Sequence, residues 1–180
     1  MRVITGKARG RKLETLKGDS VRPTADRVKE AVFSIIQFEV AGKRFLDLFS
    51  GSGQMGIEAL SRGAKEAYFI DKNREAIEII KKNIKKAEVT DRAIVKENDS
   101  FKFLLETQTK FDIVYIDPPF MIENMNQIIE MVTHVTNNDG FIICETPKDK
   151  ELVSNIEGFS ILRQYKYGKI MISIFRKCAE

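Results

Sequence analysis

The amino-acid sequence predicts an α/β fold of the Rossmann-like, doubly wound type. From residue 44 onward, short apolar runs typical of strands alternate with segments whose apolar residues recur at helical spacing. A glycine-rich turn follows the first of these runs, and two longer strand-like runs close the chain. Alternating strands and helices form a mostly parallel sheet with helices on both faces. The length of 180 residues is that of a single domain, residues 1–180.

Residues 1–44 are expected to form an N-terminal extension to a core made of residues 45–180. Residues 2–5 and 11–15 predict a small hairpin. A helix follows, because apolar residues recur at the i, i+3, i+4, i+7 and i+8 positions that make one helical face, at Val28, Ala31, Val32, Ile35 and Ile36. We therefore expect a hairpin and one amphipathic helix before the sheet.

The core is expected to alternate strands with helices. The predicted strands lie at residues 45–49, 67–70, 93–97, 111–116 and 141–145. The predicted helices lie at residues 54–62, 74–87, 100–107 and 124–136. In the third of these helices, Phe101, Phe103 and Leu104 are assigned to the hydrophobic core. The connections between parallel strands should be right-handed crossovers.

The end of the chain is expected to contain an antiparallel hairpin. Residues 160–166 and 169–176 are strand-like, and Tyr167-Gly168 joins them. So short a link has no room for a crossover, so the two strands must run in opposite directions.

The composition argues against several classes of protein. The two cysteines, Cys144 and Cys178, and the one histidine, His134, do not follow zinc-ligand spacing. The beginning of the chain lacks the apolar stretch of a signal peptide, and no run approaches the roughly 18 apolar residues of a membrane span. We therefore expect a cytoplasmic protein without a metal site or membrane contact, and a monomer by default.

Positive charge is concentrated at the front of the chain. Residues 1–44 hold 11 of the 30 basic side chains but only 5 of the 26 acidic ones. Such asymmetry is typical of a polyanion-binding face on a near-neutral body. It is equally typical of a solvated basic surface, and charge alone leaves both interpretations open.

The segment from Phe45 to Gly56 predicts a site for a nucleoside cofactor. Gly51, Gly53 and Gly56 fit the G-x-G-x-x-G spacing, in which glycines let the backbone turn sharply and let a ligand approach closely. Asp71, 20 residues after Gly51, ends the next strand, where a carboxylate can accept hydrogen bonds from both ribose hydroxyls. These signals fit a nicotinamide dinucleotide as well as S-adenosylmethionine.

Asp47 favours S-adenosylmethionine over the dinucleotide. A carboxylate just before the glycine turn would repel a pyrophosphate but would suit an ammonium and a sulfonium group. Asn98-Asp99 follows the third strand, at the sheet edge where ligands bind in such folds. Asp99 can accept the adenine amino group, cap the helix that begins at Ser100, or do both.

The sequence Asp117-Pro118-Pro119-Phe120 directly follows a buried strand and is the most specific signal in the chain. The prolines fix the backbone and leave carbonyl groups without competing local N–H donors. The Asp117 carboxylate and the Pro118 carbonyl can then accept both hydrogens of an exocyclic amine, and Phe120 can stack on the base. Two acceptors would turn the lone pair of the amine toward a methyl donor. These residues predict an amino methyltransferase that acts on nucleic acid, for which a paired base must be flipped out.

Together these motifs resemble the bacterial 16S rRNA (guanine-N2) methyltransferase family of class I S-adenosylmethionine-dependent enzymes. The resemblance covers nearly the whole chain and is carried by segments 2–11, 22–33, 45–63, 117–120 and the final strands. It implies a seven-stranded sheet with a reversed last strand and methylation of a guanine 2-amino group. It implies catalysis by the Asp117–Phe120 loop. The predicted cofactor-binding residues are Asp47, Phe49, Gly51, Ser52, Gly53, Asp71, Asn98 and Asp99.

The resemblance gives the basic front a role in binding 16S rRNA or the small ribosomal subunit, free or partly assembled. The basic side chains expected to contact phosphates are Arg2, Lys7, Arg9, Arg11, Lys12, Arg22 and Arg27. Arg27 could instead pair with Asp26 or Glu30. Three alternatives remain: a nicotinamide dehydrogenase, an amino methyltransferase on DNA adenine or cytosine, and a noncatalytic RNA-binding assembly protein.

Overall fold

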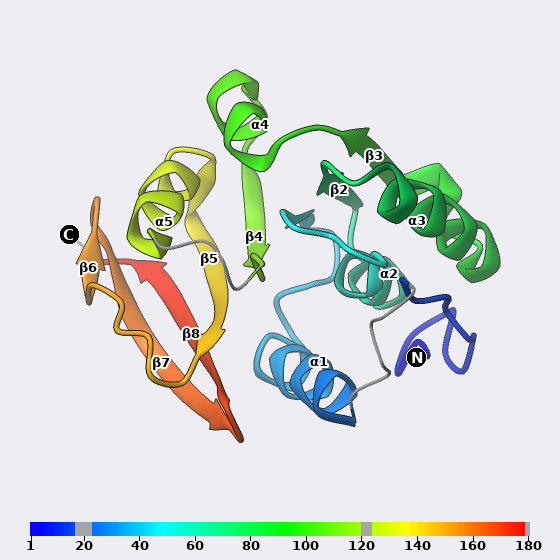
Figure 1. The fold of residues 1–180 in the computed structure, drawn as a ribbon, viewed down its shortest axis with the longest axis horizontal. Coiled ribbons are helices and arrows are strands. Elements are labelled where there is room, and N and C mark those ends of the chain that lie inside the picture. Colours follow the sequence, from blue (N-terminus) through cyan, green and yellow to red (C-terminus); the bar gives the residue numbers. More distant parts are fainter. Residues whose placement is uncertain (17–22, 120–123, 179–180) are drawn as a thin grey trace.

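The computed structural model describes residues 1–16, 23–119 and 124–178. Two of the predicted site residues, Arg22 and Phe120, lie outside these ranges. The described chain folds around a single twisted sheet with helices packed on both of its faces (Figure 1).

Five parallel strands form the larger part of the sheet, as the alternating pattern predicts. They are β1 (Arg44–Asp47), β2 (Glu66–Asp71), β3 (Ala93–Glu97), β4 (Phe111–Ile116) and β5 (Thr136–Pro147). They lie in the order β3-β2-β1-β4-β5, so the direction of the winding changes between β1 and β4. Ligands bind at such a switch point, outside the carboxyl ends of the strands.

The C-terminal strands complete the sheet in the antiparallel sense. β8 (Ile170–Lys177) pairs with β5 on one side and with β7 (Phe159–Tyr167) on the other. The hairpin loop is Gly168-Lys169, and Gly168 has a φ of +61°, which a residue without a side chain adopts most easily. An eighth strand, β6 (Asn155–Ile156), was not predicted; its two residues pair with the edge strand β7.

The helices divide the core into two layers. α1 (Pro23–Ile35), α2 (Gln54–Ser61) and α3 (Arg74–Ala87) pack on one face of the sheet, and α4 (Ser100–Glu106) and α5 (Met125–Thr133) on the other (Figure 1). Side chains of each parallel strand alternate between these layers; Phe45 faces the first and Leu46 the second. This alternation is the doubly wound arrangement that the sequence predicts.

The start of β5 differs from the prediction, in which a helix continued to residue 136. The helix ends at Thr133, and Thr136 already pairs with Phe111 of β4. The register then shifts, so that Ile113 pairs with Phe141. At Gly140 the two backbones approach so closely that a Cβ atom would lie 2.8 Å from the carbonyl oxygen of Asp112. Pairing with β4 therefore determines the boundary, against the local helical pattern.

The N-terminal segment is docked on α2, although its hairpin is reduced to one bridge between Arg2 and Lys12. The fully buried carboxylate of Glu58 accepts hydrogen bonds from the backbone N–H groups of Ile4, at 2.8 Å, and Thr5, at 3.0 Å. Val3, Ala8 and Leu13 are buried in the same core layer as α1 and α2. These contacts hold residues 1–13 against the sheet-bound helices.

Candidate active site

The glycine turn after β1 is held by the carboxylate at the end of β2. The Gly51 N–H donates to Asp71 Oδ2 at 2.9 Å, and the Asn73 N–H donates to Asp71 Oδ1 at 2.8 Å. Gly51 and Gly53 have φ values of +54° and +77°, which glycine adopts without the penalty that a side chain imposes. The Asp71 carboxylate is thus fixed beside the turn, at the carboxyl edge of the sheet.

The third glycine of the motif allows α2 to pack closely on β2. A Cβ atom at Gly56 would lie 2.3 Å from the ring of Phe69, which is itself fully buried in β2. The backbone N–H of Gly56 also donates to Asp47 Oδ2 at 3.0 Å. Gly56 therefore serves the contact between helix and sheet.

Asp47, one of the predicted cofactor-binding residues, ends β1 and lies beneath the glycine turn. Only 1% of the residue is exposed, and it is not among the residues that line the cavity described below. Burial, opposed by the hydrogen bond from Gly56, raises the pKa of the Asp47 carboxyl to about 8. In the described structure, Asp47 supports the start of α2.

Asp47 should make the stability of the protein depend on pH. Because the pKa rises from 3.8 to about 8 on folding, the folded state binds the proton more tightly. The free energy of unfolding should therefore fall as the pH rises through this window, by at most about 1.4 kcal/mol per pH unit. Between pH 5 and 8, Asp47→Asn should show a smaller fall in thermal midpoint than the wild type. The same dependence of the thermal midpoint on pH in the wild type and in Asp47→Asn would contradict the raised pKa of Asp47. Asp149→Asn, at an exposed position, is the control and should behave like the wild type.

A cavity of about 770 Å³ joins the glycine turn to the loop after β4. This volume lies within the range of about 300–1,000 Å³ found for small-molecule sites. Of the predicted cofactor-binding residues, Phe49, Gly51, Asp71 and Asp99 line the cavity, and so do Asp117, Pro118 and Pro119 of the predicted catalytic loop. Two sites predicted from separate motifs thus share one cavity.

The other predicted cofactor residues support the turn or lie beside the cavity. Ser52 and Gly53 are buried under the turn, where the Ser52 carbonyl accepts a hydrogen bond from the buried amide of Asn83. Asn98 is not among the lining residues, and its backbone N–H donates to the Asp71 carbonyl. Asp99 caps α4, because its Oδ1 accepts hydrogen bonds from the N–H groups of Phe101 and Lys102.

Several lining residues were missed or misassigned in the sequence. Phe101, predicted as core, is half-buried and lines the cavity, whereas Phe103 and Leu104 are buried as predicted. Phe101 is the second residue of α4, directly at the sheet edge, and this position is the signal that distinguishes it. The remaining lining residues are Leu16, Lys72, Asn73, Ala76 and Ser100.

The charge of this cavity fits a cationic cofactor better than a pyrophosphate. Its described lining carries three carboxylates, Asp71, Asp99 and Asp117, and one ammonium group, Lys72. S-adenosylmethionine carries a sulfonium and an ammonium group, and its ribose and adenine suit Asp71 and Asp99. The cavity therefore fits S-adenosylmethionine and disfavours the pyrophosphate of a nicotinamide dinucleotide.

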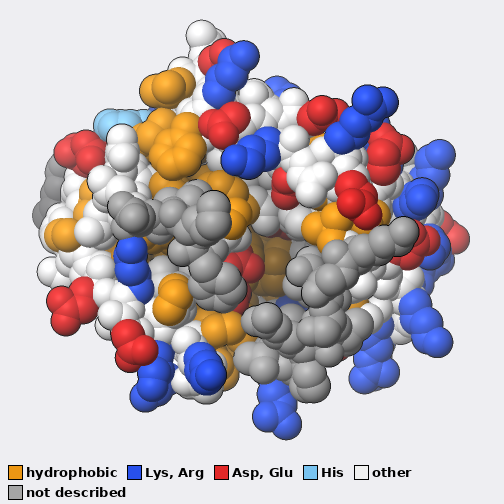
Figure 2. Space-filling model, in the orientation of Figure 1, with side chains coloured by type: hydrophobic (Ala, Val, Ile, Leu, Met, Phe, Trp, Pro, Cys, Tyr) orange, Lys and Arg blue, Asp and Glu red, His pale blue; other side chains and the backbone are white. Residues whose placement is uncertain are grey.

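The Asp117-Pro118-Pro119 turn begins where β4 ends. Asp117 and Pro119 are exposed, while the residues of β4 just before them are buried. Figure 2 shows a hollow near the middle of this face of the molecule, with hydrophobic and acidic side chains in it. Asp117 is therefore open to solvent and also lines the cavity.

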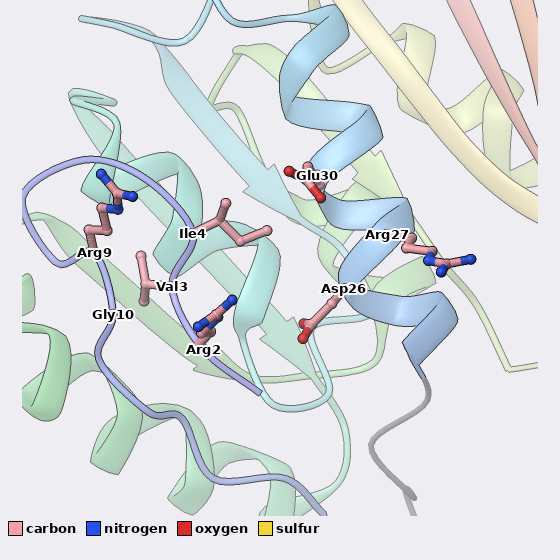
Figure 3. Close-up of a pocket in the computed structure, with 8 residues that line it drawn as sticks. All are labelled: Arg2, Val3, Ile4, Arg9, Gly10, Asp26, Arg27 and Glu30. Atoms are coloured by element: carbon pink, nitrogen blue, oxygen red, sulfur yellow. The ribbon is translucent and has the colours of Figure 1, made fainter.

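The basic residues of the N-terminal segment form a mixed surface rather than a purely positive one. Arg2, Lys7, Arg9, Lys12 and Arg27 are exposed. Figure 3 shows Arg2 and Arg9 of the N-terminal segment across from α1, which contributes Arg27. The cavity that these residues line has a volume of about 330 Å³ and is also lined by the acidic residues Asp26 and Glu30.

Arg27 and Arg11 differ in the ion pairs that they form. Asp26 lies 3.7 Å from the ammonium group of buried Lys29, and no ion pair of Arg27 is found among the described residues. Arg11, expected to contact phosphate, pairs with Glu88 at 2.7 Å and donates to the Lys86 carbonyl. Its guanidinium therefore ties the N-terminal segment to the end of α3.

Two further findings concern the described residues only. Within residues 1–16, 23–119 and 124–178, no helix is long and apolar enough to cross a lipid bilayer. The same ranges contain no cluster of three or more histidine, cysteine or acidic side chains placed to bind a metal ion.

A family model, two curated relatives and a solved structure each match nearly the whole chain. A family model described as "Conserved hypothetical protein 95" matches residues 1–176. The Bacillus subtilis (strain 168) protein "Putative rRNA methyltransferase YlbH" is 37% identical, over 98% of this chain and 99% of its own. "Ribosomal RNA small subunit methyltransferase D" of Haemophilus influenzae is 34% identical, over 98% and 93%. The solved structure "Putative methyltransferase yhhF from Escherichia coli" is 30% identical and superposes with a TM-score of 0.89, covering 100% of this chain and 99% of that one.

Proposed function

Because the chain belongs to the family of the ribosomal RNA small subunit methyltransferases, we propose that it moves a methyl group from S-adenosylmethionine to the 2-amino group of a guanine in 16S rRNA. S-adenosylmethionine is the methyl donor of such an enzyme. The observation that carries the proposal is the shared cavity, in which the glycine turn and Asp71 meet the Asp117-Pro118-Pro119 turn.

Four described side chains would hold the cofactor. Asp71, which is fixed by the Gly51 and Asn73 amides and lines the cavity, would accept hydrogen bonds from the ribose hydroxyls. Asp99 and the half-buried ring of Phe101, which line the same cavity, would hold the adenine. Phe49 lines the wall next to the glycine turn. When bound, the cofactor supplies an electrophilic methyl group on a sulfonium.

Asp117 and the Pro118 carbonyl would prepare the amine for attack. The lone pair of a guanine 2-amino group is delocalised into the ring, which makes the group a poor nucleophile. Two acceptors that bind its two hydrogens would turn the lone pair out of the ring plane. Positioning of this kind can contribute roughly 7–11 kcal/mol in favourable cases. The nitrogen becomes strongly acidic once methylated, so its proton can leave to Asp117 or to water.

The exposed basic residues would position the RNA through its phosphates. Phosphate contacts fix orientation without reading sequence and make binding sensitive to salt. The carboxylates of Asp26 and Glu30 limit how strongly this surface attracts RNA. The phosphate role therefore applies to Arg2, Lys7, Arg9, Lys12 and Arg27, and less to Arg11, which already pairs with Glu88.

Arg9→Ala should reduce the salt dependence of RNA binding. Removing one cationic side chain from a phosphate lowers the slope of log K against log salt by about 1. We expect this decrease for Arg9→Ala and a smaller one for Arg11→Ala. Lys81→Ala, on the exposed face of α3, is the control. Binding of 16S rRNA measured from 50 to 200 mM salt tests this, and an unchanged slope for Arg9→Ala would rule out its phosphate contact.

The class of substrate is tested by parallel methylation assays. Purified protein and methyl-labelled S-adenosylmethionine would be given small subunits and 16S rRNA from a strain lacking this protein, and duplex DNA in parallel. Label in the ribosomal substrates alone supports the proposal. Label in DNA would instead identify a DNA amino methyltransferase. No label in any substrate would favour a noncatalytic RNA-binding protein.

A further inference from the structure

A second, smaller cavity lies against the Asp117-Pro118-Pro119 turn. These three residues line both cavities, so the turn separates the second cavity from the cofactor cavity. The other lining residues come from the start of α5, the end of β5 with the residues after it, and the start of β8; they are Met125, Glu145, Thr146, Pro147, Lys150 and Ile170. With a volume of about 60 Å³, this cavity can take the edge of a nucleobase rather than a whole base.

One polar group of this cavity is a pre-oriented acceptor. The Tyr115 hydroxyl donates to Glu145 Oε2 at 2.5 Å, and Tyr115 is almost fully buried in β4. This hydrogen bond fixes one oxygen of the carboxylate. Within the described residues, no hydrogen bond to the other oxygen, Oε1, is found. Glu145 therefore has an acceptor available for a ligand next to the Asp117 turn.

The second polar group is a buried hydroxyl without a partner. Thr146 is 5% exposed, and its Oγ1 has no hydrogen-bond partner among the described residues. Buried polar atoms are almost always hydrogen-bonded, because leaving them unpaired destabilises the fold. Thr146 is one of the residues that line the cavity, so a ligand bound there is the candidate for the missing partner. Glu145 and Thr146 are neighbours at a strand end, so their side chains approach that end from opposite faces of the sheet.

We propose that Glu145 and Thr146 select guanine by binding the edge of the target base beside its 2-amino group. In this arrangement, which rests on the proposed function, Asp117 accepts from the 2-amino group, Glu145 accepts from N1–H and the Thr146 hydroxyl donates to O6. Guanine alone among the four RNA bases presents donor, donor and acceptor in this order. Adenine and cytosine place an acceptor nitrogen beside their amine, which a carboxylate would repel. Glu145 thus discriminates through repulsion as well as attraction.

The position of the methylated guanine in the RNA is first mapped with the wild-type protein. The test then compares two RNA fragments, one with guanine and one with 2-aminopurine at that position. 2-Aminopurine keeps the reacting amine but has an acceptor at N1 and no O6. Glu145→Gln should lower kcat/KM on the guanine RNA about 10- to 100-fold, the loss expected for one base-reading contact. Because the glutamine amide can donate to N1, the preference for guanine over 2-aminopurine should fall at least about 10-fold. Exposed Glu151→Gln should change neither value.

Thr146→Val provides an independent arm, because it removes the unpartnered hydroxyl and keeps the shape. It should lower kcat/KM on the guanine RNA while the thermal midpoint stays unchanged or rises. A purely structural threonine would not show that combination. Binding of S-adenosylhomocysteine confirms that each variant is folded; if Glu145→Gln fails this check, Thr146→Val decides.

Two results would overturn the assignment: an unchanged base preference in folded Glu145→Gln, or wild-type kcat/KM in Thr146→Val. Both are distinct from failure of the proposed function. If the proposed function fails, the wild type itself will place no methyl group on a guanine 2-amino group.

Discussion

Asp117→Ala is expected to lower the rate of methyl transfer at least about 1,000-fold while the cofactor still binds. The carboxylate is one of the two acceptors that would orient the amine, and loss of one preorganised hydrogen-bonding group in an active site costs about 100- to 1,000-fold in rate. Misplacement of the amine should add to this loss. Asp71 and the glycine turn remain intact in the variant, so binding of S-adenosylhomocysteine by calorimetry should persist.

Asp117→Asn is the matched control for this prediction. The asparagine side chain keeps one acceptor oxygen in place, so it should retain clearly more activity than the alanine variant. Single-turnover rates at saturating cofactor compare the chemical step directly. Near-normal single-turnover transfer by Asp117→Ala would remove Asp117 from the mechanism.

Asp71→Ala is expected to weaken binding of S-adenosylmethionine at least about 100-fold. Two hydrogen bonds from ribose hydroxyls to a carboxylate are worth about 1.5–3 kcal/mol each, and 1.4 kcal/mol corresponds to a tenfold change in Kd. The variant also loses the acceptor for the Gly51 and Asn73 amides, so the glycine turn becomes less well ordered. Calorimetric titration gives the change in Kd.

Glu97→Ala is the control at the same edge of the sheet. Glu97 of β3 pairs in register with Asp71, yet it is exposed and is not among the residues lining the cofactor cavity. Its removal should change Kd less than about threefold. Equal affinities for the Asp71→Ala variant and the wild type would show that the cofactor lies elsewhere.

The parallel part of the fold could be predicted because its signals are local. Strands such as β4 read as continuous apolar runs, and α3 shows a clear apolar face that ends near Glu88. The boundary at Thr136 could not be read in this way. It depends on pairing with Phe111 across the sheet, and such a contact leaves no periodic pattern in the sequence.

The candidate site was predictable wherever function requires a specific backbone. Glycines at a sharp turn and prolines after a buried strand mark positions 51–56 and 117–119 in the amino-acid sequence itself. Contacts through space are different. The burial of Asp47 under α2, the pairing of Arg11 with Glu88, and the position of Phe101 in the cavity wall all depend on how distant segments meet.

Glu145 and Thr146 illustrate the same limit. In the sequence they end an apolar run and carry no motif. Their significance arises because Tyr115 on the neighbouring strand holds Glu145, and because β5 ends beside the Asp117 turn. Both relations depend on the order of the strands in the sheet, which no local pattern of residues encodes.

The identity of the methylated nucleoside tests the central claim most directly. Small subunits and 16S rRNA from a strain lacking this protein would be methylated with labelled S-adenosylmethionine, digested to nucleosides and separated by chromatography with mass detection. Methylation of the guanine 2-amino group predicts a single labelled product, 2-methylguanosine. Label in N6-methyladenosine would contradict guanine as the target base. A ring-methylated guanosine would contradict the proposed role of Asp117 in orienting an exocyclic amine.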